Sequence, residues 1–292
     1  MLRSLLFIPG NNPAMLQNAD VHNADAVILD LEDAVSPLEK DAARILVFNA
    51  IKYLGFNKDK IVVRINPLNT DYAKQDIDTI VPLMPKYIMP SKVSSADYIK
   101  SVSALIKEAE IKNGIKENTV KIIALIETAE GIENAYPIAK ADERVEALFL
   151  GAEDLTSDMQ ALRTKEGFEI AYARGRIVTA ARSAGIEAID TPFTDVHDDE
   201  GLIKDASLAR NMGFTGKASI SPHHVSGINK AFSPSAEEID YAKAVMEAIE
   251  EGKRLGRGAV SLKGKMIDRP IVLRAEKVLN EARELGLLQG EY

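Results

Sequence analysis

The sequence predicts a (β/α)8 barrel followed by a helical C-terminal extension. Eight short apolar runs, rich in Val, Ile and Leu, lack the polar alternation of half-exposed strands, which is typical of parallel strands buried on both faces. Longer segments with helical spacing lie between these runs, and the count matches an eight-stranded barrel. An open doubly wound sheet is the alternative, but no G-x-G-x-x-G motif follows the first run.

The predicted strands cover residues 4–8, 26–29, 61–65, 87–89, 122–126, 147–150, 186–189 and 218–220. The spacing predicts helices that include 97–113, 131–141, 167–184 and 199–212, and helix ends at Gly55, Gly114, Gly185 and Gly213. The apolar run near the N-terminus is too short for a signal peptide and ends in a turn at 9–12, so we expect a buried first strand.

The pattern changes after residue 221. A charged amphipathic helix is predicted over 235–254, with Ser233 or Ser235 as its cap, followed by a glycine-rich segment at 252–264 and a last helix over 270–285. Pro270 suits the first turn of that helix, where a backbone N–H has no partner. We predict no strand in this tail. The expected domains are a catalytic barrel at 1–234 and a C-terminal helical arm at 235–292 that packs on a neighbouring subunit.

The composition excludes several classes of function. The 292 residues carry 36 Lys and Arg against 44 Asp and Glu, a net charge of −8, so we expect neither a nucleic-acid partner nor a membrane partner. No uninterrupted apolar stretch approaches the roughly 20 residues that cross a bilayer. The absence of Cys excludes disulfides, a thiolate nucleophile and Cys metal sites, and it fits a cytoplasmic protein.

Acidic side chains follow several predicted strands, at the end of the barrel where active sites lie. These residues are Asp30, Glu32, Asp33, Glu127, Glu153, Asp154 and Asp190, with Arg64 and Lys92 as nearby cations. Polar residues also accumulate wherever strands meet solvent, which is the simpler explanation for any one of them. Several carboxylates at one barrel mouth repel each other unless a cation lies between them. Mg²⁺ suits such oxygen ligands, so the sequence predicts a magnesium site.

The remaining chemistry points to a 2-oxo acid. No zinc-protease H-E-x-x-H and no G-x-S-x-G motif occurs. Arg64 offers a planar fork for a carboxylate, and a metal ion polarises a carbonyl, which together suit carbon–carbon bond making or breaking beside a carbonyl. An enolase-like function or a phosphate-handling function of the barrel stays an alternative, because such barrels carry similar acids. Lys92 suits a Schiff base, but a solvated loop lysine is the preferred interpretation.

Seven sequence motifs carry a family resemblance. They are FIPGNN at 7–12, DLEDAV at 30–35, VRIN at 63–66, IETA at 126–129, GAEDL at 151–155, AARSAGI at 180–186 and GKMIDRP at 264–270. In this order they resemble the citrate lyase β-subunit family, within the citrate-lyase-like (HpcH/HpaI aldolase) superfamily of (β/α)8 lyases. The resemblance extends over nearly the whole chain.

The resemblance implies roles for individual residues. Glu127 and Asp154 match the family's two Mg²⁺ ligands, and Glu127 also borders the substrate. Arg64 matches the arginine that binds the oxo-acid product. The catalytic set further includes Glu32 and Asp33, acids near the metal-bound water, and Asp268, an acid that closes over a neighbouring subunit's site.

The resemblance also implies the reaction, which is cleavage of a citryl thioester on an acyl-carrier protein or CoA into oxaloacetate and an acetyl thioester. It implies acyl-carrier and acyl-transferase partner subunits and a homo-oligomer, a trimer or hexamer. Alternatives are a stand-alone malyl-CoA or methylmalyl-CoA-type lyase, a related 2-oxo-acid aldolase, or a catalytically silent scaffold. The family's arginine before a Leu-Pro-Lys sequence is absent from this chain, which leaves acyl-group preference and carrier choice open.

Overall fold

The computed structural model contains a closed barrel of eight parallel strands, which confirms the predicted fold class. Each strand pairs with the next along the chain, and the first pairs with the eighth. The structure describes residues 1–255, 260–262 and 264–288; parts of the predicted glycine-rich segment and of the predicted arm's end lie outside this range. The barrel strands are β1 Ser4–Pro9, β2 Ala26–Asp30, β3 Ile61–Ile65, β4 Tyr87–Pro90, β5 Lys121–Ile126, β6 Val145–Leu150, β7 Glu187–Asp190 and β8 Gly216–Ser219.

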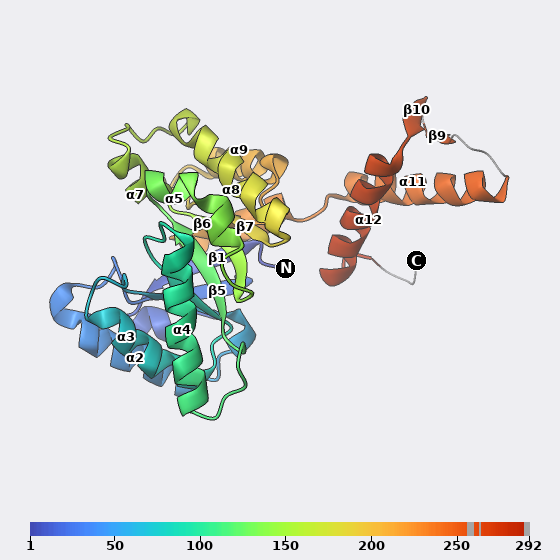
Figure 1. Ribbon diagram of the computed structural model, residues 1–292. Helices are drawn as coiled ribbons and strands as arrows, with labels where there is room; N and C mark the ends of the chain where they lie inside the picture. The colour runs from blue at the N-terminus through green and yellow to red at the C-terminus, as the bar shows by residue number, and fades with distance from the viewer. Residues whose placement is uncertain (256–259, 263, 289–292) are drawn as a thin grey trace. The chain divides into compact units, whose positions relative to one another are not determined.

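Helices surround the strands, with α2, α3 and α4 along one side of the barrel and α8 and α9 along another (Figure 1). The α-helices of this part are α1 Pro13–Gln17, α2 Lys40–Tyr53, α3 Tyr72–Ile80, α4 Ala96–Lys112, α5 Ala129–Glu133, α6 Ala135–Ala139, α7 Ala152–Asp158, α8 Ala171–Ala184, α9 Asp199–Met212 and α10 Pro222–Phe232. Short 3₁₀ turns are η1 Pro37–Glu39, η2 Lys58–Lys60, η3 Val81–Leu83 and η4 Phe168–Ile170. None of the described helices has the length and apolar composition needed to cross a membrane.

The single helix predicted over 131–141 was wrong. The structure has two short helices there, α5 and α6, separated at Asn134. Pro137 lies in the first turn of α6 and has no backbone N–H to donate to a preceding turn, so a continuous helix would lose one of its hydrogen bonds there. The predicted helix ends at Gly185 and Gly213 are confirmed, because both glycines are left-handed C-caps.

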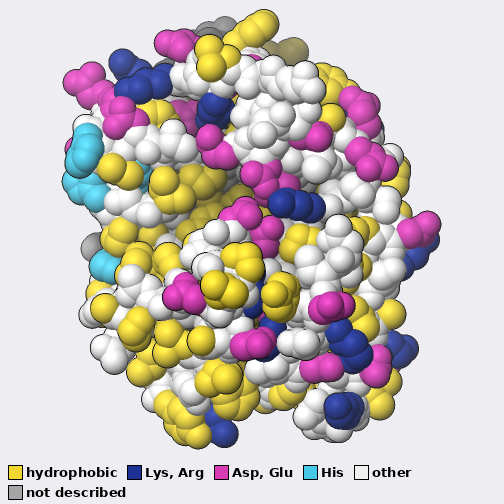
Figure 2. Space-filling model, turned by 90° about the vertical axis from the view of Figure 1, so that its left-hand side faces the viewer, with side chains coloured by type: hydrophobic (Ala, Val, Ile, Leu, Met, Phe, Trp, Pro, Cys, Tyr) yellow, Lys and Arg dark blue, Asp and Glu magenta, His cyan; other side chains and the backbone are white. Residues whose placement is uncertain are grey.

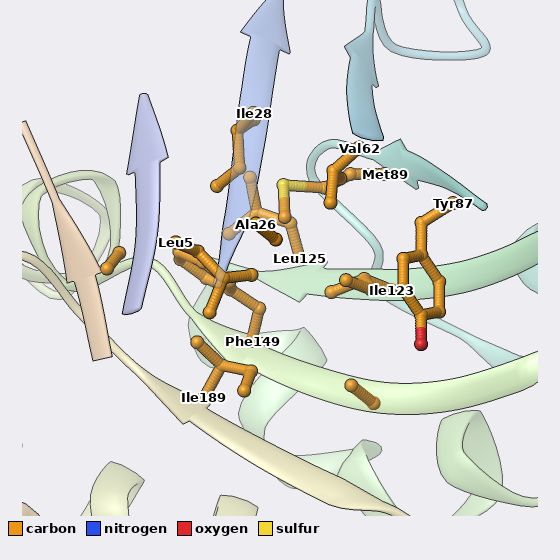
Figure 3. Packing of buried hydrophobic residues seen from close by; sticks show 12 residues of the cluster. Leu5, Ala26, Ile28, Val62, Tyr87, Met89, Ile123, Leu125, Phe149 and Ile189 are labelled. Carbon is orange, nitrogen blue, oxygen red and sulfur yellow. The ribbon is translucent and has the colours of Figure 1, made fainter. Parts of the chain in front are cut away.

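Alternate residues of the strands fill the barrel interior (Figure 3). The interior cluster consists of Leu5, Ala26, Ile28, Val62, Tyr87, Met89, Ile123, Leu125, Ala147, Phe149, Ile189 and Ala218. The residues between them face the helices and are equally buried, for example Leu6, Val27 and Val63. Burial on both faces explains why the strands appear in the sequence as continuous apolar runs.

The chain forms two compact units, Leu2–Asn229 and Lys230–Tyr292 with Met1. The second unit contains helices α11 Ala236–Arg254 and α12 Arg269–Glu284, which share an apolar core. Ser235 and Glu238 form the capping box at the start of α11. The prediction of no strand in this tail was wrong, because β9 Val260–Leu262 and β10 Lys265–Ile267 form an antiparallel hairpin. Runs of three residues are too short to show strand periodicity.

A buried cluster of charges ties β7 and β8 to helices α8 and α9. The Lys217 ammonium lies 2.6 Å from both Asp190 Oδ2 and Asp205 Oδ2. Arg174 donates hydrogen bonds to the same two carboxylates at 2.7 to 3.0 Å. Asp190 directly follows the inward-facing Ile189, so its side chain points outward, toward the helices. Asp190 is therefore a structural acid, and its expected place among the acids of the mouth was wrong.

We expect Lys217→Ala to destabilise the protein by about 3–5 kcal/mol, because it removes one partner of a buried charge cluster and leaves two carboxylates with a single arginine. Urea denaturation measures this loss. The matched control is Lys74→Ala, which breaks the surface pair with Asp78 and should leave the urea midpoint almost unchanged. Equal effects of the two substitutions would contradict a structural role for the cluster.

Candidate active site

Arg64 and Asp30 form the centre of the barrel mouth, the end of the barrel where the strands' carboxyl termini meet. The two residues are register neighbours on β3 and β2. Both continue the inward-facing positions of their strands, after Val62 and Ile28. Arg64 donates two parallel hydrogen bonds to Asp30, from Nε at 2.7 Å and from Nη2 at 2.6 Å. Asp30 is almost fully buried, so this pair is a fixed part of the site.

The Arg64 guanidinium is the main positive charge of the mouth. Burial disfavours its charge, but the hydrogen bonds to Asp30 and the charges of Asp30, Glu32 and Glu127 outweigh burial and raise the pKa of Arg64. Its third nitrogen, Nη1, lies 3.2 Å from Glu32 Oε2 and 3.5 Å from Asp33 Oδ2. The guanidinium carbon also lies 5.0 Å from the centre of the Phe7 ring. Arg64 therefore links the loop after β2 to the mouth.

Asp30 is one of the predicted strand-end acids, but its sequence position predicted no specific role for it. Besides binding Arg64, its two carboxylate oxygens accept hydrogen bonds from the backbone N–H groups of Glu32 and Ala34, at 2.8 and 3.2 Å. Asp30 thereby holds the loop that carries the predicted acids Glu32 and Asp33. Asp30 lies at a strand end directly across from Arg64, which could have indicated the ion pair. That inference requires the register of β2 and β3, which the sequence does not give.

Glu127 and Asp154, the two predicted metal ligands, line one cavity at the mouth. Glu127 follows β5 and is 3% exposed, whereas Asp154 lies in the first turn of α7. A side chain at Gly151 would place its Cβ 2.8 Å from Glu127 Oε2, so glycine leaves the room that this carboxylate occupies. Burial, and next the charge of Asp154, raise the pKa of Glu127 to about 8. The two carboxylates thus repel each other across the cavity.

This donor set fits a hard divalent cation. A cation between Glu127 and Asp154 would remove their repulsion, and carboxylate oxygens are the ligands that Mg²⁺ prefers. In the described part of the chain, no group of three or more His, Cys, Asp or Glu residues is arranged to hold a metal ion. Two protein carboxylates are sufficient for Mg²⁺, which fills its other positions with water and substrate oxygens. The residues present therefore fit magnesium rather than a closed structural metal site.

Glu32 and Asp33 occupy different environments. Glu32 is buried, and its Oε2 accepts a hydrogen bond from the backbone N–H of Asp33 at 2.9 Å. Burial, and next a hydrogen bond with the Asp33 side chain, raise the pKa of Glu32 to about 7. The Asp33 side chain is 53% exposed and lines the cavity. Asp33 thus faces the space where a substrate would lie, and Glu32 lies beside it.

Lys92 follows β4 with an uncommon backbone conformation, a left-handed φ of 53°. Its backbone N–H donates a hydrogen bond to Glu127 Oε1 at 2.8 Å. Its ammonium lies 3.6 Å from Glu32 Oε1 and 3.8 Å from Asp154 Oδ2. Burial lowers its pKa, but the charges of Glu32, Asp33 and Asp154 outweigh burial and raise it, so Lys92 stays protonated and is unsuited to a Schiff base. The preferred expectation of a solvated loop lysine missed these contacts.

The cavity has a volume of about 450 Å³ and a mixed lining. Arg64 and several acids line it together with apolar residues, among them Phe7, Pro9, Met15, Pro192 and Ile220. Figure 2 shows acidic and basic side chains gathered beside a hollow with hydrophobic walls. Such a cavity suits a substrate that has both charged and apolar parts.

Asp268, the remaining predicted catalytic residue, belongs to the second unit. It is the exposed N-cap of α12, and its Oδ1 accepts a hydrogen bond from the backbone N–H of Ile271 at 3.1 Å. None of the contacts described above includes Asp268. Its part in catalysis stays a prediction.

The raised pKa values of Glu127 and Glu32 make the stability of the metal-free protein depend on pH. Above an ordinary carboxyl pKa of about 4.5, the unfolded chain has lost protons that the folded protein still holds, so stability falls as pH rises from about 5 to about 8. Urea denaturation in EDTA across this range measures the slope, and Glu127→Gln should reduce it. An unchanged slope in that variant would contradict the raised pKa.

Mg²⁺ affinity should rise over the same pH range, since the metal binds the ionised carboxylates.

Comparison with known proteins identifies relatives of this chain. The family model for HpcH/HpaI aldolase/citrate lyase matches residues 3–222. The citrate lyase subunit beta of Leuconostoc mesenteroides subsp. cremoris is 42% identical over 99% of this chain and 96% of its own length. Protein CitE from Mycobacterium tuberculosis, in complex with magnesium, acetoacetate and coenzyme A, superposes with a TM-score of 0.81 at 30% identity, over 96% of this chain and 98% of that one.

A second solved structure is also similar to this chain. The citrate lyase beta subunit from M. tuberculosis, complexed with oxaloacetate and magnesium, is 30% identical, with a TM-score of 0.67 over 79% of this chain and 96% of that one. The family model covers three quarters of the chain, and the bacterial citrate lyase subunit matches nearly all of it. This protein therefore belongs to the HpcH/HpaI aldolase/citrate lyase family.

Proposed function

We propose that this protein is a Mg²⁺-dependent carbon–carbon lyase that cleaves a citryl thioester into oxaloacetate and an acetyl thioester, as the β subunit of a citrate lyase. The observation that carries the proposal is the arrangement of Glu127, Asp154 and Arg64 around one cavity. Two carboxylates suited to Mg²⁺ lie there beside a guanidinium suited to a carboxylate. Relatives named citrate lyase subunit beta, and the magnesium and oxaloacetate of a similar structure, support the same activity.

Glu127 and Asp154 would hold the metal ion in this reaction. Held there, Mg²⁺ would supply Lewis-acid polarisation of a substrate carbonyl oxygen. Arg64 holds the carboxylate of the 2-oxo acid, for which its Nη1 remains outside the two hydrogen bonds to Asp30. The fixed orientation of the guanidinium lowers the cost of ordering the substrate.

Asp33 is the proposed general base. It lines the cavity, and a base must lie within hydrogen-bond reach of the proton it removes. Asp33 takes the proton of the tertiary hydroxyl, the ketone of oxaloacetate forms, and the electrons of the broken bond pass to the thioester fragment as an enolate. Asp268 is the proposed acid that returns a proton to the enolate carbon, which yields the acetyl thioester. The reaction balances without an oxidant or reductant.

The proposal extends to the assembly. Asp268 acts on the site of a neighbouring subunit, so the enzyme is a homo-oligomer, a trimer or hexamer, in which the arm 235–292 packs on the next subunit. The acyl group arrives on an acyl-carrier protein, with an acyl-transferase subunit as the other partner, and the complex works in the cytoplasm.

Cleavage of citryl-carrier protein and citryl-CoA in the presence of Mg²⁺ tests the activity directly. Failure with both substrates would refute it, and a preference for malyl-CoA would favour the stand-alone lyase.

We expect Glu127→Gln and Asp154→Asn each to lower kcat/KM for citryl-thioester cleavage by about 100-fold or more, because each removes a negative charge that would hold the metal ion. Calorimetric titration with Mg²⁺ should show weaker binding in both variants. The matched control is Glu130→Gln, an exposed carboxylate near Glu127, which should retain activity. Wild-type turnover and metal affinity in Asp154→Asn would remove Asp154 from the metal site.

Mixed oligomers test the proposed role of Asp268. Asp268→Asn keeps a side-chain acceptor for the cap of α12 and removes the acid. We expect Asp268→Asn and Arg64→Ala proteins to be nearly inactive alone and to regain activity when subunits are exchanged, because some sites then combine an intact Arg64 with an intact Asp268. The readout is the rate of citryl-thioester cleavage after mixing. No recovery in oligomers shown to be mixed would count against an acid supplied by the neighbouring subunit.

A further inference from the structure

We propose that Lys92 determines the specificity of this site for a 2-oxo acid that carries a second carboxylate, as oxaloacetate does and pyruvate does not. The inference rests on the proposed function and concerns the edge of the same cavity, where the Lys92 ammonium lies 3.8 Å from the lining residue Asp154. It follows from the surroundings of Lys92, which differ from those of the other cations near the mouth.

The other cations nearby already have close partners. Arg64 donates two hydrogen bonds to Asp30. The ammonium of Lys40 is buried and donates to the backbone carbonyl oxygens of Leu31 and Glu32 at 2.9 and 2.7 Å. Arg163 pairs with Glu153 and Glu169 at 3.1 and 2.7 Å. A ligand carboxylate would have to displace these partners from Lys40 or Arg163, and the free nitrogen of Arg64 already serves the carboxylate beside the keto group.

Lys92 is held loosely by comparison. Within the described residues, the carboxylate oxygens nearest to its ammonium belong to Glu32 and Asp154, at 3.6 and 3.8 Å, beyond ordinary hydrogen-bond length. The side chain is 44% exposed, so a ligand can reach it. When Asp154 binds a metal ion, its negative charge is shared with that ion and holds the ammonium less strongly. Lys92 is then a cation available to an incoming anion.

The backbone of Lys92 directs the side chain to this place. Non-glycine residues seldom adopt a positive φ, and such conformations concentrate at functional sites. Here the conformation lets one residue contact both sides of the site, with its backbone N–H on Glu127 and its ammonium near Asp154. The position of the ammonium is therefore coupled to the two carboxylates that suit the metal ion.

Substrate chemistry supplies the reason for a second cation. A metal ion and Arg64 satisfy the keto group and the adjoining carboxylate, which oxaloacetate and pyruvate share. Oxaloacetate carries another carboxylate where pyruvate has only hydrogen, and an unpaired charge in a partly enclosed cavity is costly. A lysine ammonium beside the metal site offsets that charge. The same lysine offers pyruvate nothing to bind.

Calorimetric titration of the Mg²⁺-loaded full-length protein with fresh oxaloacetate and with pyruvate tests the inference. In Lys92→Met, we expect oxaloacetate affinity to fall on the order of tenfold to a hundredfold, the usual effect of losing a charge-assisted hydrogen bond, with pyruvate affinity unchanged. Lys92→Arg should restore most of the preference. Lys92→Gly, which accepts the left-handed backbone without strain, should behave as Lys92→Met does.

Two controls separate the possible failures. Lys204→Met removes an exposed lysine on α9 and should change neither affinity. Titration with Mg²⁺ alone shows whether Lys92→Met alters the metal site. Equal weakening of both acids, or no weakening of either, would overturn the role of Lys92 while leaving the proposed lyase in place. A wild-type protein that binds neither acid and cleaves no citryl thioester would overturn the proposed function as well.

Discussion

The buried pair of Arg64 and Asp30 is the interaction on which the barrel mouth depends. It joins two adjacent strands at their inward-facing ends, and each partner holds further parts of the site. Asp30 accepts backbone hydrogen bonds from the loop after β2, and Arg64 lies against Phe7 and faces Glu32 and Asp33. Removing Arg64 would leave the buried Asp30 carboxylate without its partner cation, which is costly. A single ion pair thus positions groups that are distant in the sequence.

The barrel arranges its charged side chains in two contrasting ways. In the cluster of Asp190, Asp205, Arg174 and Lys217, each carboxylate contacts both cations, and the cluster joins strands to helices. At the mouth, by contrast, Glu127 and Asp154 repel each other and the pKa of Glu127 is raised. Repulsion of this kind has no structural benefit. The arrangement is explained if a divalent cation binds between the two carboxylates, because its positive charge attracts both of them.

Much of the fold follows from local patterns. The buried strands, the capping box of α11 and the C-caps at Gly185 and Gly213 were all legible, because each depends on a few neighbouring residues. The failures have local causes as well. The break between α5 and α6 comes from one proline within a weak helical pattern, and the β9–β10 hairpin consists of strands only three residues long.

The sequence by itself determined the family, the barrel and the chemical character of the mouth, because strand order alone brings the acids after β2, β5 and β6 to one end with Arg64. Only the tertiary structure decided which strand-end acids face that site. Asp30 lies two residues after an inward residue and points inward, whereas Asp190 lies one residue after an inward residue and points to the helices. Side chains alternate along a strand, so a shift of one residue reverses their direction. The position of the Lys92 ammonium likewise depends on carboxylates from separate strands and loops, which no local pattern contains.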